Sequence, residues 1–126
     1  MRDMVTTIIE NKALLLGDNF FETGAIELEA GQEIKEGAFI KRGAAPNMFE
    51  LVTDLEEEEP IAIIPVTIKN NKAAAAKESL RACLGGKVRA DMLHINGVQA
   101  NKEEIDLLRK YGFIPIYAHD ISRAEG

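Results

Sequence analysis

The side chains best suited to binding a metal ion are two histidines and two aspartates: His94, His119, Asp91 and Asp120. Zinc sites in proteins hold the ion with three or four such ligands, often in closely spaced pairs. Here a long interval separates the histidines, and no third soft ligand lies near either of them. The sequence therefore predicts no metal site, and we expect both histidines on the surface or in the core.

The single cysteine, Cys83, leaves no partner for an internal disulfide, and no candidate base lies beside it in the sequence. A lone cysteine in a strand usually serves packing. The acidic run Asp54–Glu59 lacks the ordered ligand positions and the turn glycine of a calcium loop, which favours a solvated loop. No glycine-rich loop precedes a lysine and a hydroxyl residue, as a phosphate cradle requires. We therefore expect no enzyme, no catalytic residue and no cofactor.

Two lysines offer another kind of chemistry, the covalent attachment of a prosthetic group. The segment Ala30–Ile40, AGQEIKEGAFI, is similar to the half-barrel turns of biotinyl and lipoyl carrier domains. Those domains present a lysine at a hairpin tip, beside methionine or another specific neighbour. Lys35 and Lys41 have no such setting, and the internal symmetry of a carrier domain is missing. A cellular small-β binding or carrier module remains the alternative function.

The composition indicates one domain with a single core, since the chain has 126 residues of which 46% are hydrophobic and 29% charged. A net charge of −6 disfavours a nucleic-acid partner. The longest apolar run, Ile61–Ile68, is too short to span a membrane, and the N-terminus lacks the pattern of a secretory signal. The first 60 residues carry 14 acids and 5 bases, whereas the rest carries 7 acids and 10 bases. This asymmetry fits solvated loops, or subunits that meet front to back with complementary fields.

The framework is organised around Ala25–Lys41. Ile26 and Leu28 alternate with glutamates, which is the two-residue period of a strand with one buried face. Gly31 and Gly37 then interrupt the apolar residues, and glycine accepts the positive φ of sharp reversals between short strands.

Further strands are predicted over Met48–Thr53 and over Ile61–Ile68, where Pro65 marks an edge or a bulge. The alternation in Leu80–Leu84 predicts another strand, and Gly85-Gly86 is a hairpin signal. The alanine run before this strand, Ala73–Ala76, is expected to be a loop or a short helical turn.

One helix is predicted over Asn101–Tyr111. Asn101 can cap its N-terminus with Glu104 at the third helical position, and Gly112 provides a left-handed stop. Phe113–Ile116 follows as a last short strand. The expected fold class is thus mainly β with one helix (α+β), with the helix and a strand at the C-terminal end.

The first 19 residues are predicted to form an extended arm, and residues 20–126 a single β-rich domain whose core strands begin after Phe21. Thr6, Thr7, Ile8 and Ile9 favour extension, and the apolar residues Leu14, Leu15 and Leu16 follow them. Such a segment can become ordered on the sheet edge of a partner, or it can be a simple edge strand of the same domain.

Three blocks of the chain resemble the bacteriophage head decoration proteins, the lambda-decoration-like family. The first is Leu15-Leu16-Gly17-Asp18, followed by the turn Ala30-Gly31-Gln32, Gly37 and Ile40. The second is Gly86–Leu93, GKVRADML, and the third is Leu107–Ile114, LLRKYGFI. Their order and spacing agree with the family over roughly Leu14–Tyr117. The chain departs from it at Asn70–Glu78, where the family usually has a shorter and more polar turn.

The resemblance implies a small β-clip-like barrel that forms homotrimers on the outer surface of a phage or prophage capsid. Its partner would be the major capsid protein, and its N-terminal arm would reach toward the shell. The capsid-binding residues would then be Thr6, Thr7, Ile8, Ile9, Leu14, Leu15 and Leu16. The protein would be made in the cytoplasm of the bacterial host and end up as a head protein of the virion, with neither nucleic acid nor membrane as a partner.

Overall fold

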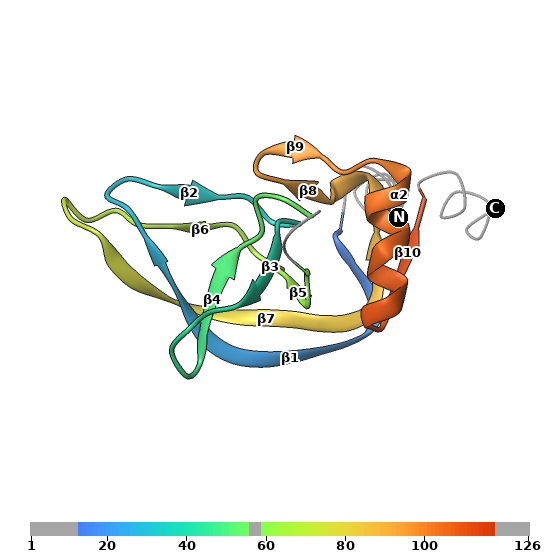
Figure 1. The fold of residues 1–126 in the computed structure, drawn as a ribbon, viewed down its shortest axis with the longest axis horizontal. Helices are drawn as coiled ribbons and strands as arrows, with labels where there is room; N and C mark the ends of the chain where they lie inside the picture. The colour runs from blue at the N-terminus through green and yellow to red at the C-terminus, as the bar shows by residue number, and fades with distance from the viewer. Residues whose placement is uncertain (1–12, 56–58, 118–126) are drawn as a thin grey trace, which may run out of the picture.

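The computed structural model describes residues 13–55 and 59–117, and this part of the chain is mostly β with one short α-helix (Figure 1). In chain order the elements are β1 (Leu15–Leu28), β2 (Glu33–Ile34), β3 (Phe39–Arg42), β4 (Met48–Leu51), β5 (Ala62–Ile63), β6 (Ile68–Lys69), β7 (Ala76–Arg89), the 3₁₀ turn η1 (Ala90–Met92), β8 (His94–Ile95), β9 (Val98–Gln99), α2 (Lys102–Leu107), the 3₁₀ turn η2 (Leu108–Tyr111) and β10 (Phe113–Ile116). The predicted α+β class, with a helix and a strand at the C-terminal end, is confirmed.

A small barrel forms the body of the molecule. Its strands follow the order β1-β4-β3-β5-β7, and β7 closes the barrel by pairing with β1. The antiparallel β1–β7 ladder runs from Leu15 opposite Val88 to Leu28 opposite Ala76, and it is the long ribbon along the bottom of Figure 1. Strand β10 adds to the barrel by pairing in parallel with the last residues of β7. The two longest strands thus connect one end of the molecule to the other.

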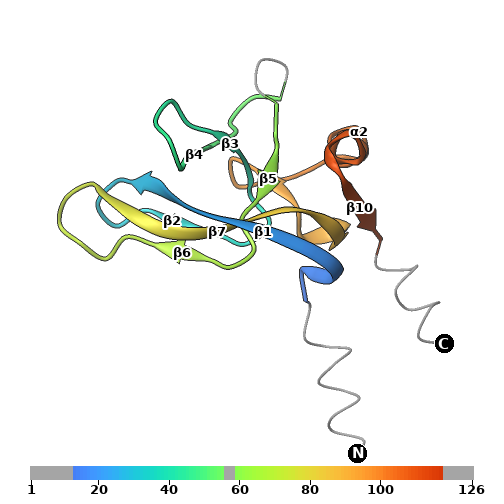
Figure 2. The same ribbon diagram turned by 90° about the horizontal axis from the view of Figure 1, so that it is seen from below.

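Two short ribbons accompany the barrel. One pairs β2 with β6, and Figure 2 shows it beside the β1–β7 ladder. The other pairs β8 with β9 around Asn96 and Gly97, which both have positive φ, as a tight two-residue hairpin requires. This hairpin at Asn96-Gly97 is not among the sequence-based predictions, which instead place one at Gly85-Gly86.

The buried residues divide into two clusters on opposite faces of β7. One contains Leu14, Phe39, Val52, Ile63, Cys83, Val88, Ala90, Leu93, Ile95, Ala100, Ile105, Leu108 and Phe113. The other contains Ile26, Leu28, Ile34, Ala38, Ile40, Phe49, Ala62, Ile64, Leu80 and Ala82. Strand β7 contributes to both clusters, because alternate side chains of a strand point to opposite faces. Ile26 and Leu28 lie inward with Glu27 and Glu29 outward, as their alternation predicts.

The reversals predicted at Gly31 and Gly37 are confirmed, with φ of +72° and +94°. Gly37 also meets a tight contact, since a Cβ there would lie 2.0 Å from the carbonyl oxygen of Met92. Its amide donates to Ile64 O at 2.7 Å, and its carbonyl accepts from His94 N at 3.1 Å. Only glycine suits a backbone that turns here while touching η1.

The predicted hairpin at Gly85-Gly86 is wrong, because β7 continues through both glycines to Arg89. Gly86 has φ of +98°, and a Cβ on it would lie 2.4 Å from the carbonyl oxygen of Asp18. The register of the β1–β7 ladder shifts in this region, so the glycines permit an irregular crossing of two strands. With β1 on one edge and β10 on the other, extended backbone at this position satisfies more hydrogen bonds than a reversal would.

The single strand predicted over Ile61–Ile68 is likewise corrected to two short strands. Strand β5 ends at Ile63 and pairs with β3, whereas β6 begins at Ile68 and pairs with β2. Pro65 lies in the turn between them and carries no amide hydrogen for a ladder. The apolar run therefore serves two different sheets.

The predicted helix is confirmed with its caps. The side chain of Asn101 accepts from the amide of Glu104 at 2.9 Å, and the carboxylate of Glu104 accepts from the amide of Asn101 at 2.8 Å. Gly112 ends the following 3₁₀ turn in the left-handed conformation. Ile105 and Leu108 are buried as expected, so α2 and η2 close one end of the core.

Candidate interaction surface

The predicted capsid-binding residues fall into two groups. Thr6, Thr7, Ile8 and Ile9 lie outside the described residues. Leu14 is only 3% exposed and packs in the core, and its carbonyl accepts from the amide of Arg89 at 2.8 Å. Leu15 pairs with Val88 at the start of β1, and Leu16 is half-buried beside it.

The predicted boundary at residue 19 is therefore corrected for the part of the arm that the structure describes. The sequence suggests an arm because Leu14–Leu16 precede a glycine and lie far from the first alternating strand. Leu14 and Leu15 instead pack with the core cluster that contains Val88, and Leu15 pairs with Val88, a contact between residues far apart in the chain that no local pattern reveals. Leu14 to Asn19 belong to the folded domain, and only the residues before Ala13 remain candidates for an arm.

Asn19 fixes the start of β1 against β7. Its Nδ2 donates to the carbonyl oxygens of Gly85 at 3.2 Å and Lys87 at 3.0 Å. Its Oδ1 accepts from the amide of Gly17 at 3.0 Å. These bonds bridge the irregular part of the ladder, where the strands do not pair residue by residue. The side chain thus replaces backbone hydrogen bonds that the register shift removes.

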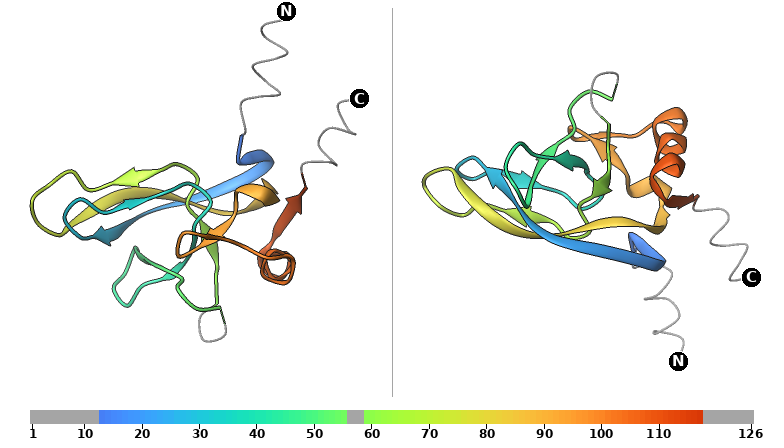
Figure 3. Two further views of the ribbon diagram at one scale, coloured as in Figure 1. Left: turned by 90° about the horizontal axis from the view of Figure 1, so that it is seen from above. Right: turned by 60° about the horizontal axis from the view of Figure 1, so that its bottom comes forward.

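A three-stranded sheet results at this end of the molecule, and we call it the three-strand end. It consists of Leu15–Phe20 from β1, Gly85–Arg89 from β7, and β10. Strand β1 begins here and β10 ends here, so both terminal segments join the domain at the same end (Figure 3).

Two large apolar side chains are exposed at the three-strand end, Phe20 at 54% and Ile114 at 48%. They flank β7, since Phe20 is opposite Gly85 and Ile114 is opposite Lys87. The ring of Phe20 covers Gly85, where a Cβ would come within 2.5 Å of the ring. Exposed apolar groups gathered near one site favour a contact with another protein. Sequence reasoning missed both residues, although the adjacent aromatic pair Phe20-Phe21 was a usable signal.

The side chains considered for metal binding are engaged in other contacts or lie outside the described residues. Asp91 accepts from Nε of Arg89 at 2.7 Å. Nε2 of His94 lies 3.2 Å from the carbonyl of Lys35 and 3.1 Å from that of Glu36, so this nitrogen donates its hydrogen. His119 and Asp120 lie outside the described residues. Within residues 13–55 and 59–117, no group of three or more histidine, cysteine or acidic side chains is placed to hold a metal ion.

Cys83 is fully buried in the core, and burial raises the pKa of its thiol. A buried, protonated thiol is a poor nucleophile. The sulfur donates to the carbonyl of Gly85 at 3.3 Å, which fits the packing role predicted from the sequence.

The two lysines weighed as carrier sites differ in their surroundings. Lys41 lies within β3, half-buried, with its amine 3.9 Å from a carboxylate oxygen of Glu50. Lys35 follows β2, is well exposed, and pairs with Glu33 at 3.0 Å. Lys41 is therefore not presented at a turn.

Among the described residues, no helix has the length and apolar character needed to cross a membrane. Comparisons with protein-family models, with curated proteins and with solved structures find no match to this chain.

Proposed function

We propose that this chain is a structural virion protein that binds the outer surface of a phage capsid and stabilises the expanded shell. One observation carries the proposal. Segments of the three blocks that resemble the head decoration proteins, although far apart in the sequence, lie side by side at the three-strand end. Leu15 is opposite Val88, and Phe113 is opposite Gly86 on the other edge of β7. Segments recognised separately in the sequence are therefore neighbouring strands of one sheet.

In the proposed mode of binding, the three-strand end faces the shell. The residues before Ala13 would leave the domain there, next to the exposed side chains of Phe20 and Ile114. Ordering an extended segment costs roughly 1–2 kcal/mol per residue, so it should become ordered only on a sheet edge of the major capsid protein. The buried side chain of Leu14 would anchor the segment to the barrel.

The assembly that suits this mode is a homotrimer on a local three-fold axis of the shell. Three segments acting together bind far more tightly than one, because the second and third contacts form within one complex. Light scattering coupled to size exclusion should give three times the chain mass at micromolar concentration. A persistent monomer would make trimerisation dependent on the capsid.

The test is co-sedimentation with expanded, undecorated phage capsids. We expect the full chain to co-sediment and a truncated chain that begins at Ala13 to lose binding while keeping its circular dichroism spectrum. A chain that begins at Phe20 is less informative, because it lacks Leu14 and part of the β1–β7 ladder. Loss of the buried Leu14 side chain alone costs about 2–5 kcal/mol.

The possible results distinguish an error in the proposed function from an error in the proposed binding site. If the full chain fails to bind any expanded capsid, the proposed function is wrong. If the full and truncated chains bind equally, the function stands but the contact lies elsewhere. Phe20→Ser and Ile114→Ser, both at exposed positions, then test the remainder of the three-strand end.

A further inference from the structure

A slot of about 340 Å³ lies between β6 and β7, away from the three-strand end. Residues from two segments line it, Pro65, Val66, Thr67, Ile68 and Lys69 on one side and Ser79, Leu80 and Arg81 on the other. Val66 is 68% exposed, although its side chain is apolar. The sequence predicts a continuous buried strand here, so this hollow follows only from the separation of β5 and β6.

One wall of the slot is a strand edge, as the register of the β1–β7 ladder indicates. On β1, the amide of Ala25 donates to Asn47 O, on the side away from β7. The N–H and C=O groups of successive residues point to opposite edges of a strand. Those of Gly24 therefore point to β7, where Gly24 pairs with Leu80. Its neighbours Ser79 and Arg81 therefore direct their N–H and C=O groups to the other edge of β7.

The pairing of β5 leads to the same conclusion. The amide of Ile64 donates to Ala38 O on the β3 side. The N–H and C=O groups of the preceding residue, Ile63, therefore point to β7, where Ile63 pairs with Cys83. The main-chain N–H and C=O groups of Cys83 therefore point to the edge of β7 that faces away from β1. Two and four residues earlier, Arg81 and Ser79 point to that edge as well. Strand β5 ends at Ile63, and within the described residues no strand pairs with this edge of β7, the one facing away from β1, at Ser79 or Arg81.

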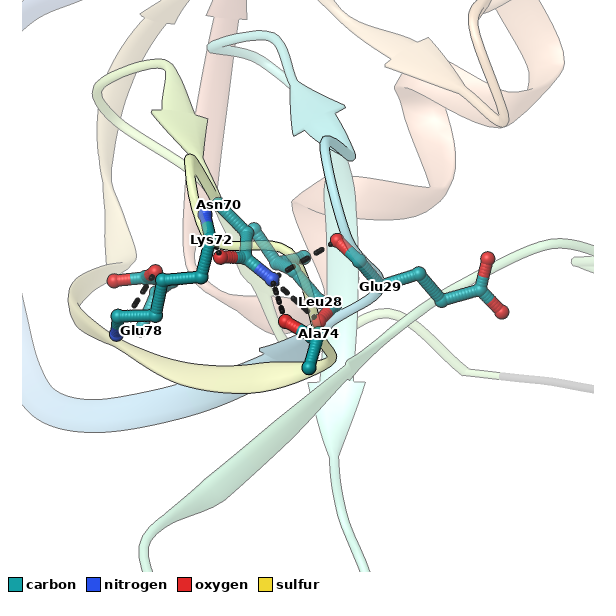
Figure 4. Close-up of polar contacts among 6 residues, drawn as sticks. All are labelled: Leu28, Glu29, Asn70, Lys72, Ala74 and Glu78. Carbon is teal, nitrogen blue, oxygen red and sulfur yellow. Dashed lines mark hydrogen bonds and ion pairs between the residues drawn. The ribbon is translucent and has the colours of Figure 1, made fainter.

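The slot remains open because β6 is held elsewhere. Strand β6 pairs with β2, and the six residues between β6 and β7 do not form a tight hairpin. Asn70 determines their path, since its Nδ2 donates to the carbonyls of Leu28 at 3.1 Å, Glu29 at 3.0 Å and Ala74 at 3.0 Å (Figure 4). This loop is tied to the end of β1, so the slot is formed before any partner arrives.

Both charged side chains that line the slot are cationic. Lys69 and Arg81 line it, and no acidic residue does. Among the described residues no ion pair is found for either cation, although Lys69 is opposite Glu33 on β2, and Lys35 and, less strongly, Lys69 lower the pKa of the Glu33 carboxyl. The guanidinium of Arg81 lies 4.2 Å from the ring centroid of Phe21 on β1, so Arg81 lines the slot while its charged end also contacts the neighbouring strand.

We propose that the slot binds an extended segment of a partner protein that carries a carboxylate. The segment adds a strand to β7 at Ser79 and Arg81, while its small apolar side chains fill the space beside Val66 and its carboxylate faces Lys69 and Arg81. Such strand addition gains affinity from main-chain hydrogen bonds and specificity from alternate side chains. The inference goes beyond the proposed function and does not depend on it.

The test measures backbone hydrogen exchange of the full chain by NMR with two capped hexapeptides, one alternating valine with glutamate and the other valine with lysine. We expect the glutamate peptide to slow exchange of the Ser79 and Arg81 amides at least tenfold. It should bind at least ten times more tightly than the lysine peptide at low salt, and more weakly as salt rises. Unchanged exchange at both amides with millimolar glutamate peptide, or equal affinity for the two peptides, would overturn the proposal.

Matched variants test the strand edge itself. Ser79→Pro removes an amide that points into the slot and not to β1, so it should weaken binding at least tenfold, whereas Ser79→Ala keeps the amide and should bind like the wild type. Lys69→Glu, on the opposite wall, reverses a charge at an exposed position and should weaken binding of the glutamate peptide tenfold. This variant keeps the proposal testable if Ser79→Pro fails to fold. Wild-type affinity in a folded Ser79→Pro variant, or in Lys69→Glu, would refute the geometry.

Discussion

Asn70 is the polar residue on which the loop between β6 and β7 depends. It is fully buried, and its side chain makes four hydrogen bonds to main-chain groups. The two hydrogens on Nδ2 are shared among the carbonyls of Leu28, Glu29 and Ala74, and Oδ1 accepts from the amide of Lys72 at 2.9 Å. The side chain thus connects the end of β1 to the loop before β7.

Replacing Asn70 with alanine removes all four bonds, but their costs differ. Leu28 is 1% exposed, so water does not replace the donor that its carbonyl loses, and this loss costs about 1–3 kcal/mol. Glu29 and Ala74 are exposed, and water can replace the lost donor there. We therefore expect Asn70→Ala to lower the free energy of unfolding by about 3 kcal/mol, a large share of the roughly 5–15 kcal/mol typical of a domain.

Asn70→Asp keeps the shape of the side chain but places a carboxylate against three carbonyl oxygens. Burial and these oxygens raise the pKa of the introduced carboxyl above its unfolded value, about 3.9 for aspartate. A raised folded-state pKa gives stability that is present below the unfolded pKa and lost as pH rises through the folded one. Asn70→Asp should therefore be less stable than Asn70→Ala at pH 7, and its deficit relative to wild type should shrink toward pH 4.

Urea unfolding followed by circular dichroism measures these differences, at one protein concentration for all variants because association would shift the midpoints. Asn71, the next residue, is exposed, so Asn71→Ala is the matched control and should stay within about 0.5 kcal/mol of wild type. A loss of 3 kcal/mol corresponds to about 12 °C in Tm for a domain of this size. If Asn70→Ala is within 1 kcal/mol or so of Asn71→Ala, the bonds of Asn70 do not stabilise the loop.

Three further predictions follow from the positions of single residues. Gly37→Ala should cost several kcal/mol, because its Cβ would clash at 2.0 Å, whereas Gly97→Ala, with positive φ but open space, should cost only about 1 kcal/mol in thermal melts. Hydrogen bonding to Arg42 lowers the pKa of Glu22, so their pairing stabilises the fold above the unfolded pKa of glutamate and is lost as pH falls through the lower folded value. Glu22→Gln should accordingly flatten the acid side of the curve of unfolding free energy against pH, and an unchanged curve would contradict this. Cys83 should react with a thiol reagent only as fast as the protein opens, and rapid labelling of the native protein would show that the thiol is accessible.

The sequence by itself determined the elements whose signals lie within a few residues. The helix after Asn101 is one, because its capping box and its left-handed stop at Gly112 satisfy the backbone groups that a helix end leaves unpaired. The alternation around Ile26 and Leu28 is another, because a strand with one buried face needs that period wherever its partner lies. These predictions required no knowledge of the other strands.

Positions that depend on distant partners were decided only by the tertiary structure. Gly85-Gly86 has the composition of a hairpin, yet β1 and β10 occupy both edges of β7 there and keep the chain extended. Asn96-Gly97 forms the real hairpin, because the backbone at both residues has positive φ. Two glycines tolerate either conformation, so their composition alone does not choose between a bulge and a turn.

The candidate surfaces likewise combine features that have local sequence signals with features that depend on distant contacts. A leucine run after a β-branched segment indicates an extended arm, but burial of Leu14 against the end of β7 is a contact between residues far apart in the chain. For the exposed ring of Phe20 the only local signal is the adjacent aromatic pair Phe20-Phe21, and the hydrogen bonds of Asn70 and the open edge at Ser79 have no local signal. Each depends on which strand lies beside which, and strand pairing is set by long-range burial and register, which short stretches of sequence do not encode.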